Sequence, residues 1–262
     1  MRGRRGAWIR GAGIVAAALV CAGTANGAEC SVAAAADLRF ALEAVIPEFG
    51  KSHPDVEVKV TYGSSGSFFA QISNGSPFDL FLSADADYSA KLLEARLAVP
   101  GSEFVYGFGR LVVWVRKDSP LDLDARGALA LADPRVRKIA MANPRHAPYG
   151  RAAEAALRSL GLFNAVKEKL VFGENVAQAT QFVESGAADA GLVALSLARA
   201  PGMSEKGRWV ELPVSSYPAL RQTGVVLKEA KGAAAASAFR DFLVGPEGRA
   251  VLARYGFVPP PP

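Results

Sequence analysis

Four short polar loops constrain the fold of this chain more than any other feature of its sequence. Each loop follows a predicted strand, which is a short apolar run or, at 56–62, an alternating one, and opens a segment whose apolar residues recur with helical spacing. The loops occupy residues 36–37, 63–67, 143–150 and 173–176. Because short apolar runs are typical of buried parallel strands, the pattern predicts repeated strand–loop–helix units. Such alternation is typical of an α/β fold with mainly parallel sheets flanked by helices.

The rest of the chain continues this alternation. Strands are predicted near residues 30–36, 56–62, 79–83, 111–115, 138–141, 171–172, 190–194 and 224–227. Helices are predicted near residues 38–49, 68–73, 88–97, 151–160, 177–186, 233–244 and 247–255. In parallel sheets, ligands bind beyond the carboxyl ends of the strands, where the helices begin. All four polar loops occupy that position.

The composition of the four loops favours a small anion as the ligand. A helix start presents unpaired backbone N–H groups and the positive end of the helix dipole, and both attract negative charge. The loops also carry hydroxyl groups and little charge of their own. Two of them lie in the first third of the chain and two in the middle, so a cleft between two lobes is the simplest way to bring them together.

Residues 1–27 have the features of a secretory signal. A basic front is followed by an apolar run at 12–23 and by small residues at 25–27, which predict cleavage before Ala28. The apolar run is too short to span a bilayer comfortably, and no later segment is long enough. The sequence therefore predicts an exported protein without membrane insertion.

Removal of this leader changes the charge of the protein. The full chain carries 30 Lys and Arg against 25 Asp and Glu, but four of the basic residues and none of the acids lie in the leader. The mature net charge is then about +1, which removes the main argument for a nucleic-acid or membrane-surface partner. Cys30 is the one cysteine left, so no internal disulfide or cysteine metal site is expected, and its thiol is predicted to be exposed or half-buried.

Six segments of the chain, taken together and in this order, resemble the periplasmic molybdate-binding proteins of ABC importers. This family is a branch of the two-lobed solute-binding proteins. The segments are residues 33–45, 62–85, 109–115, 143–157, 173–196 and 242–257, which extend over nearly the whole mature chain. Each segment alone is a weak signal, whereas the ordered set is specific.

The resemblance implies a complete set of expectations about fold and function. Two α/β lobes joined by crossing strands would close on the ligand, with lobe I formed by 28–107 plus 224–262 and lobe II by 108–223. The protein would be a periplasmic monomer without a cofactor. It would capture molybdate, or tungstate as a second candidate, and deliver it to an inner-membrane ABC permease.

The family's ligand positions can be carried over to individual residues of this chain. The first-loop position falls on Asp37, the second on Ser65 with Ser64 beside it, and the third on Tyr149. The fourth position, which binds through a backbone N–H, falls on Val176. Some members place a tyrosine where this chain has Ala194, so the sequence resembles the subgroup with a third-loop tyrosine.

Asp37 departs from the family pattern, which usually has Ser or Asn at this position. A carboxylate about 4 Å from a dianion costs about 8 kcal/mol, taking about 4 kcal/mol for each pair of unit charges at intermediate dielectric. Three roles for this residue are open. Asp37 caps its own helix by accepting from the N–H groups near Phe40, or it accepts a proton from a protonated oxyanion such as phosphate or arsenate, or the ligand differs from the family's usual one.

Other candidate groups in the sequence give weaker signals. Asn175 is expected to cap its helix, and His53 and His146 are expected at the surface because they lack metal-ligand spacing. No nucleophile elbow or phosphate-binding P-loop pattern occurs, so no enzymatic activity is expected. A secreted hydrolase and a ligand-binding lobe that feeds a sensor are the alternatives from other functional classes.

Overall fold

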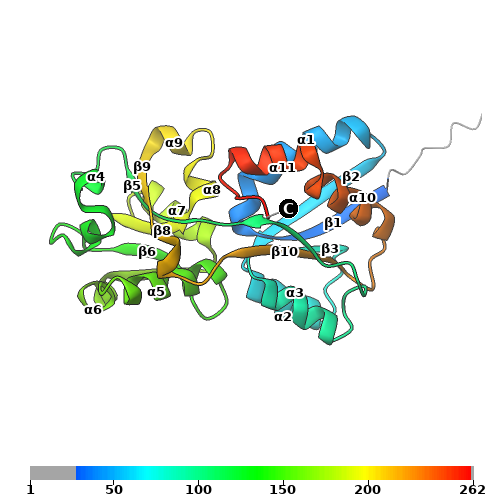
Figure 1. Ribbon diagram of the computed structural model, residues 1–262, viewed down its shortest axis with the longest axis horizontal. Coiled ribbons are helices and arrows are strands. Elements are labelled where there is room, and N and C mark those ends of the chain that lie inside the picture. Colours follow the sequence, from blue (N-terminus) through cyan, green and yellow to red (C-terminus); the bar gives the residue numbers. More distant parts are fainter. Residues whose placement is uncertain (1–27, 261–262) are drawn as a thin grey trace, which may run out of the picture.

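The computed structural model describes residues 28–260, which form two lobes side by side along the long axis of the molecule (Figure 1). Each lobe is built on its own five-stranded sheet flanked by helices. The predicted α/β architecture with two lobes is therefore confirmed. The predicted leader, residues 1–27, lies outside the described residues.

The sheet of the first lobe has the strand order β2-β1-β3-β10-β4. Its strands are β1 (Ala28–Ala35), β2 (Val56–Gly63), β3 (Leu80–Ser83), β4 (Phe104–Phe108) and β10 (Arg221–Val226). β1 runs parallel to β2 and β3, whereas β10 is antiparallel to β3 and β4. The helical segments of this lobe are η1 (Ala36–Leu38), α1 (Arg39–Ser52), α2 (Ser65–Ser73), α3 (Ala86–Glu94), α10 (Ala233–Val244) and α11 (Pro246–Arg254).

The sheet of the second lobe has the strand order β7-β6-β8-β5-β9. Its strands are β5 (Leu111–Arg116), β6 (Ile139–Ala142), β7 (Leu170–Gly173), β8 (Ala190–Ala194) and β9 (Gly207–Glu211). β6 is parallel to β7 and β8, and β5 is antiparallel to β8 and β9. The helical segments are α4 (Leu123–Arg126), η2 (Gly127–Ala132), α5 (Pro148–Ser159), α6 (Phe163–Val166), η3 (Lys167–Lys169), α7 (Val176–Glu184), α8 (Leu195–Ala198), α9 (Met203–Lys206) and η4 (Val214–Ser216).

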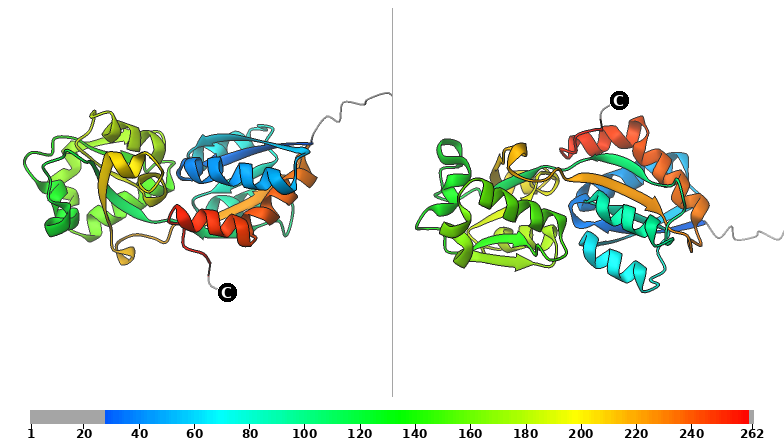
Figure 2. Two further views of the ribbon diagram at one scale, coloured as in Figure 1. Left: turned by 90° about the horizontal axis from the view of Figure 1, so that it is seen from above. Right: turned by 60° about the horizontal axis from the view of Figure 1, so that its bottom comes forward.

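Two stretches of chain cross between the lobes, from β4 to β5 and from β9 to β10 (Figure 2). They lie close together, because the backbone N–H of Gly109 donates to the carbonyl of Leu220 at 2.9 Å. The chain therefore leaves the first lobe once, completes the second, and returns to form β10 and the last helices. The lobe limits expected from the sequence, 107/108 and 223/224, stay a prediction.

Strands β4 and β9 are absent from the strands expected from the sequence. Both are antiparallel edge strands, and their sequences, FVYGF and GRWVE, include glycine or charged residues. An edge strand is covered on fewer sides than a central one, so it needs no continuous apolar run. The sequence pattern could identify the central strands, which do need such runs, and the two other edge strands, β2 and β7, whose apolar residues form alternating or short continuous runs.

The cores of both lobes consist of apolar side chains between sheet and helices. Cys30, on the central strand β1, is fully buried among Val32, Leu42 and Phe239 in the core of the first lobe. The expectation of an exposed or half-buried thiol is therefore wrong, because this strand is covered by neighbouring strands and by α10. Burial, followed by the negative charge of Asp79, raises the pKa of the Cys30 thiol to about 12.

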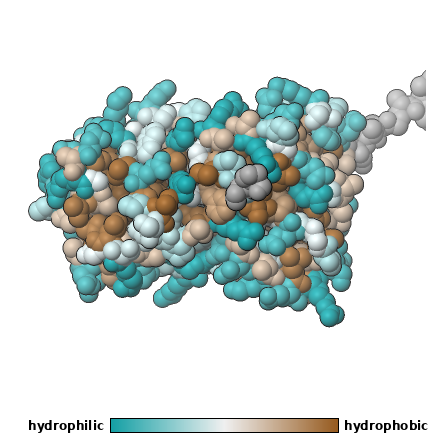
Figure 3. Space-filling model, viewed as in Figure 1, coloured by the Kyte–Doolittle hydropathy of each residue, from teal (hydrophilic) through white to brown (hydrophobic). Residues whose placement is uncertain are grey.

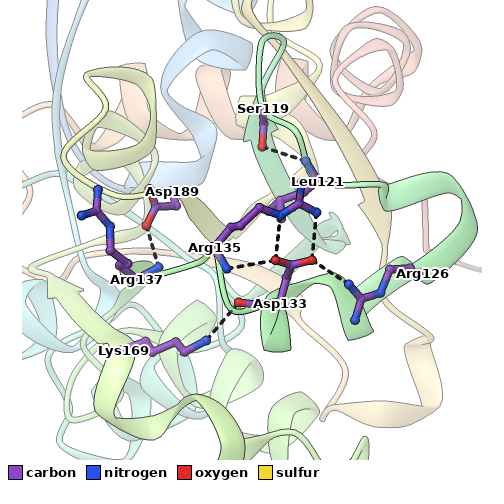
Figure 4. Close-up of polar contacts among 8 residues, drawn as sticks. All are labelled: Ser119, Leu121, Arg126, Asp133, Arg135, Arg137, Lys169 and Asp189. Carbon is purple, nitrogen blue, oxygen red and sulfur yellow. Dashed lines mark hydrogen bonds and ion pairs between the residues drawn. The ribbon is translucent and has the colours of Figure 1, made fainter.

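A cluster of charged residues fixes the segment that precedes β6 (Figure 4). The Asp133 carboxylate accepts from Arg135 at 2.9 Å and from Arg126 at 2.8 Å, and the bonds from Arg135 are the main reason that its pKa lies well below the usual range. Asp189 accepts from the backbone N–H groups of Arg137 and Lys138 at 2.8 and 2.9 Å. These contacts stabilise a surface segment of the second lobe.

The surface mixes hydrophilic and hydrophobic residues over both lobes on the face shown in Figure 3. Within residues 28–260, no helix has the length and apolar character needed to cross a membrane. The same part of the chain contains no group of three or more His, Cys, Asp or Glu side chains arranged to hold a metal ion.

Candidate functional site

The four polar loops meet around one cavity at the junction of the two lobes. η1 and α2 follow the parallel strands β1 and β2 in the first lobe, and α5 and α7 follow β6 and β7 in the second. The space between the lining atoms of this cavity is about 200 Å³, part of which is open to solvent. Its lining residues are Ala35, Ala36, Asp37, Gly63, Ser64, Ser65, Ala84, Ala147, Pro148, Tyr149, Asn175 and Val176. The structure thus brings together all five residues expected to bind the ligand.

Local sequence explains why helices begin at this cavity. Ser64 precedes α2 with an extended backbone, and its Oγ accepts from the N–H of Ser67 at 3.2 Å. Asn175 precedes α7 in the same way and accepts from the N–H of Gln178 at 3.0 Å, which confirms its predicted capping role. Pro148 occupies the start of α5, where its missing N–H is harmless. The first N–H groups of these helices are therefore left for other partners.

Ser65 is a fully buried residue at the start of α2. Its Oγ accepts from the backbone N–H of Ala84, which follows β3, at 3.0 Å. That bond uses a lone pair of the hydroxyl and leaves its proton for donation. Ser65 can therefore act as a donor to an anion in the cavity while the adjacent strand fixes the position of its oxygen.

Val176 and Tyr149 line the cavity from the second lobe. Val176 is the first residue of α7, so its backbone N–H has no acceptor within the helix. Tyr149 is buried, and its hydroxyl is without a hydrogen-bond partner among the described residues. Burial, and then the charge of Asp37, raises the pKa of Tyr149 well above its ordinary value, so the phenol keeps its proton. Both groups are thus neutral donors.

Asp37 is buried on the wall of the same cavity. Its Oδ2 accepts from Nε2 of Gln222 on β10 at 2.9 Å, and its backbone carbonyl accepts from the Ser196 hydroxyl at 2.7 Å. Its Oδ1 is without a hydrogen-bond partner among the described residues. Burial raises the pKa of this carboxyl to about 7, against smaller lowering effects led by the Tyr149 hydroxyl, which faces the carboxyl without meeting hydrogen-bond geometry.

The prediction that Asp37 caps its own helix is wrong. Neither η1 nor α1 has a side-chain capping bond, because Asp37 already lies within the helical turn of η1. A capping residue instead has an extended backbone outside the helix, as Ser64 and Asn175 do. The Asp37 carboxyl reaches toward Gln222. The two other roles of Asp37 stay open. It accepts a proton from a protonated oxyanion, or the ligand differs from the family's usual one.

His146 is half-buried, with 24% of its side chain exposed, and it lies beside the cavity without lining it. Its Nδ1 lies 2.9 Å from Oγ of Ser64, and its Nε2 lies 3.4 Å from a carboxylate oxygen of Glu174. Its backbone carbonyl accepts from the N–H of Gly66 at 2.9 Å. His146 therefore joins the loop of the first lobe to two loops of the second. His53, by contrast, is half-exposed and stacks on Phe49.

A second contact across the lobes lies beside the first. Arg151 of α5 pairs with the Asp85 carboxylate and donates to the Tyr88 hydroxyl at 3.2 Å, with its guanidinium over the Tyr88 ring. Asp85 and Tyr88 belong to the first lobe and Arg151 to the second. These contacts form only when the lobes are together, so they stabilise the closed arrangement.

We expect Arg151→Gln to weaken ligand binding about 3- to 10-fold, mainly through faster dissociation. The side chains of Arg151 and Asp85 are 39% and 24% exposed, so solvent screening limits their contribution to about 1 kcal/mol. Stopped-flow dissociation rates provide the measurement. Arg158→Gln is the matched control, because Arg158 pairs with Glu154 within the same helix and should leave the rate unchanged. Equal rates for both variants would contradict the prediction.

A larger groove lies elsewhere between the lobes, beside α1, α7 and α9. Its space is about 690 Å³, part of which is open to solvent, and it is lined by charged groups such as Arg39, Glu184 and Lys206. These charges are paired, Arg39 with Glu43 at 3.5 Å and Lys206 with Glu184 at 2.6 Å. The four polar loops surround the smaller cavity, which is therefore the candidate ligand site.

Several residues of the site were missed by the sequence interpretation. Gln222 lies on an antiparallel strand with no local signal of a polar role. Arg151 follows the third polar loop directly, so its position at a helix start was a usable signal. Ala194, where some relatives place a tyrosine, is fully buried at the end of β8 and is not among the residues lining the cavity.

Comparisons with known proteins agree with this fold. Residues 30–258 match the family of bacterial extracellular solute-binding proteins. The chain is 39% identical to the molybdate-binding protein of Azotobacter vinelandii over 247 residues, which cover 94% of each chain. It is 39% identical to the molybdate-binding protein of Rhodobacter capsulatus over 201 residues, which cover 77% of each chain.

Solved structures also show similarity to a molybdate-binding protein. The periplasmic molybdate-binding protein of Azotobacter vinelandii superposes with a TM-score of 0.83 at 35% identity, covering 88% of this chain and all of that one. The sulfate-binding protein of Mycobacterium tuberculosis shares the fold at 20% identity, with a TM-score of 0.71. With two lobes, four helix starts around one cavity and a family match over nearly all the described residues, the chain belongs to the bacterial extracellular solute-binding proteins.

Proposed function

We propose that this protein captures molybdate in the periplasm and delivers it to an ABC importer, with tungstate as a second ligand. The observation that carries the proposal is the arrangement of Asp37, Ser64, Ser65, Tyr149 and Val176 around one cavity between the lobes. The relatives named as molybdate-binding proteins support the choice of anion. The protein would act as a monomer, without catalysis or cofactor, after removal of residues 1–27.

The chemistry of the cavity supports a dianion that is bound without a counter-cation. The lining residues include no Lys or Arg, so the attraction comes from hydroxyl groups, backbone N–H groups and helix dipoles. A hydrogen bond to a charged partner contributes about 1.5–3 kcal/mol, so about five would give ~7–15 kcal/mol before ordering costs. A Kd in the micromolar range or below follows, and neutral donors allow the lobes to reopen.

Calorimetry on the protein that begins at Ala28 tests this proposal. The titrants are molybdate, tungstate, sulfate, phosphate and arsenate, each at two pH values. We expect molybdate and tungstate to bind with micromolar or lower Kd, and sulfate to bind much more weakly. A protein that binds none of the five anions, or that hydrolyses simple phosphate esters, would contradict the proposed function.

Asp37 favours a second candidate ligand class, a protonated oxyanion such as phosphate or arsenate. The unpaired oxygen Oδ1 of its buried carboxyl can accept a proton from such an anion. The same titrations separate the two candidates. Binding of phosphate or arsenate alone, strongest where the protonated form dominates, would replace molybdate as the ligand.

A further inference from the structure

The carboxyl of Asp37 is a buried acid with one satisfied and one unsatisfied oxygen. The residue is 1% exposed and lines the cavity. The hydroxyl of Tyr106 donates to Oε1 of Gln222 at 2.9 Å, which turns the amide nitrogen of Gln222 toward Asp37 Oδ2. Because Oδ2 is therefore an acceptor, Oδ1 is the position at which a proton can reside.

The groups that face this carboxyl are neutral. They are Tyr149 of α5, Tyr106 of β4 and Gln222 of β10. Tyr217 lies near Tyr149 and adds slightly to the rise in the pKa of Tyr149. Each tyrosine that the Asp37 charge reaches has its pKa raised well above the ordinary value and remains protonated. No cation among the described residues hydrogen-bonds or forms an ion pair with Asp37.

The charged groups on adjoining elements are engaged elsewhere. Arg39, at the start of α1, pairs with Glu43, and Tyr62 of β2 donates to the carbonyl of Arg39 at 3.4 Å. His146 and Glu174 contact each other at the edge of the cavity. An ionised Asp37 would consequently meet an incoming dianion with a full negative charge and an acceptor oxygen.

A proton on Oδ1 removes both obstacles. It neutralises the carboxyl and converts its unpaired oxygen into a hydrogen-bond donor, which a fully deprotonated oxyanion can accept. Burial already raises the pKa of Asp37 to about 7 in the closed arrangement, and a neighbouring dianion raises it further. The proton comes from solvent and is returned when the lobes open.

We propose that Asp37 binds one proton together with each oxyanion, so that capture and release of the ligand are linked to pH. This inference rests on the proposed function, because it concerns the same cavity and a dianionic ligand. The proton is then a reactant in the binding equilibrium. Raising the pH lowers the proton concentration, so the affinity for the oxyanion falls. Between the pKa of the Asp37 carboxyl in the unliganded protein and its higher pKa in the complex, molybdate affinity should fall close to tenfold for each pH unit.

The first test counts protons in the wild-type protein. Molybdate is titrated calorimetrically at about pH 8 in two buffers with different heats of ionisation, and the difference gives the number of protons taken up. We expect close to one proton for each anion. Tight binding with no proton uptake and no pH dependence would overturn the inference but leave the proposed function intact. Absence of binding in every buffer would instead overturn the proposed function.

Variants then assign the proton to Asp37. Asp37→Asn keeps the shape of the side chain and supplies a permanent N–H donor, so it should bind molybdate with no proton uptake and a nearly flat pH profile. Asp37→Ser, with a neutral hydroxyl, replaces it if the first variant does not fold. His146→Asn is the control, because the imidazole lies beside the cavity against Ser64 without lining it, and proton uptake should persist in this variant. Unchanged uptake in Asp37→Asn, or its loss in His146→Asn, would overturn the assignment.

Discussion

Replacing Gly66 with alanine should weaken molybdate binding at least about a hundredfold while the unliganded protein stays stably folded. Gly66 is the second residue of α2, and its N–H donates to the carbonyl of His146 across the cleft at 2.9 Å. A Cβ at this position would lie 2.5 Å from that carbonyl oxygen and 2.7 Å from the Tyr88 hydroxyl. Because the carbonyl belongs to the backbone of the other lobe, relief of the first clash requires the lobes to separate.

The expected magnitude follows from the donors that separation removes. Tyr149 and the N–H of Val176 come from the second lobe, and each hydrogen bond to a charged ligand contributes about 1.5–3 kcal/mol. Loss of both amounts to ~3–6 kcal/mol, or at least about a hundredfold in Kd. Within the helix itself, alanine is no worse than glycine, so the thermal stability of the unliganded protein should not fall.

Three measurements separate this effect from misfolding. Calorimetry gives the Kd, thermal unfolding without ligand gives the Tm, and small-angle X-ray scattering shows whether ligand still compacts the molecule. Gly50→Ala in α1 is the matched control, because a Cβ there has no atom within 4 Å in the described structure. A Kd for Gly66→Ala within about threefold of the wild-type value would show that close contact at this point is not required for binding.

The helix starts that surround the cavity could be predicted because their signals are local. A short strand with an apolar or alternating pattern, a small polar loop and a periodic helix follow one another within about twenty residues at Ser64 and at Asn175. Capping by the loop side chain is also a local interaction. Location of the site therefore required no knowledge of how the lobes pack.

The directions of individual side chains could not be predicted, because they depend on residues far away in the chain. Asp37 bonds to Gln222, 185 positions later, and not to its own helix. His146 contacts Ser64 from 82 positions away, in the other lobe. Both partners are supplied by packing between strands or between lobes, and neither position carries a local pattern that would indicate it.

Ser65→Ala should weaken molybdate binding by about 30- to 150-fold, through the loss of one charge-assisted donor worth about 2–3 kcal/mol. The substitution has a second effect, because the Ser65 hydroxyl also accepts from the buried N–H of Ala84 at 3.0 Å. An unsatisfied buried donor costs about 1–3 kcal/mol, so the free energy of unfolding of the unliganded protein should fall as well. Denaturant unfolding and calorimetry measure the two effects separately.

Ser89→Ala separates loss of stability from loss of binding. Ser89 is also fully buried in the first lobe, and its hydroxyl bonds to that of Thr223 at 2.9 Å, but it does not line the cavity. This control should lose stability and retain the wild-type Kd. If Ser65→Ala behaved in the same way, Ser65 would only support the strand at Ala84. A Kd that rises in Ser65→Ala alone would show that its proton is donated to the ligand, because both variants lose a buried hydrogen bond and only one loses a group that lines the cavity.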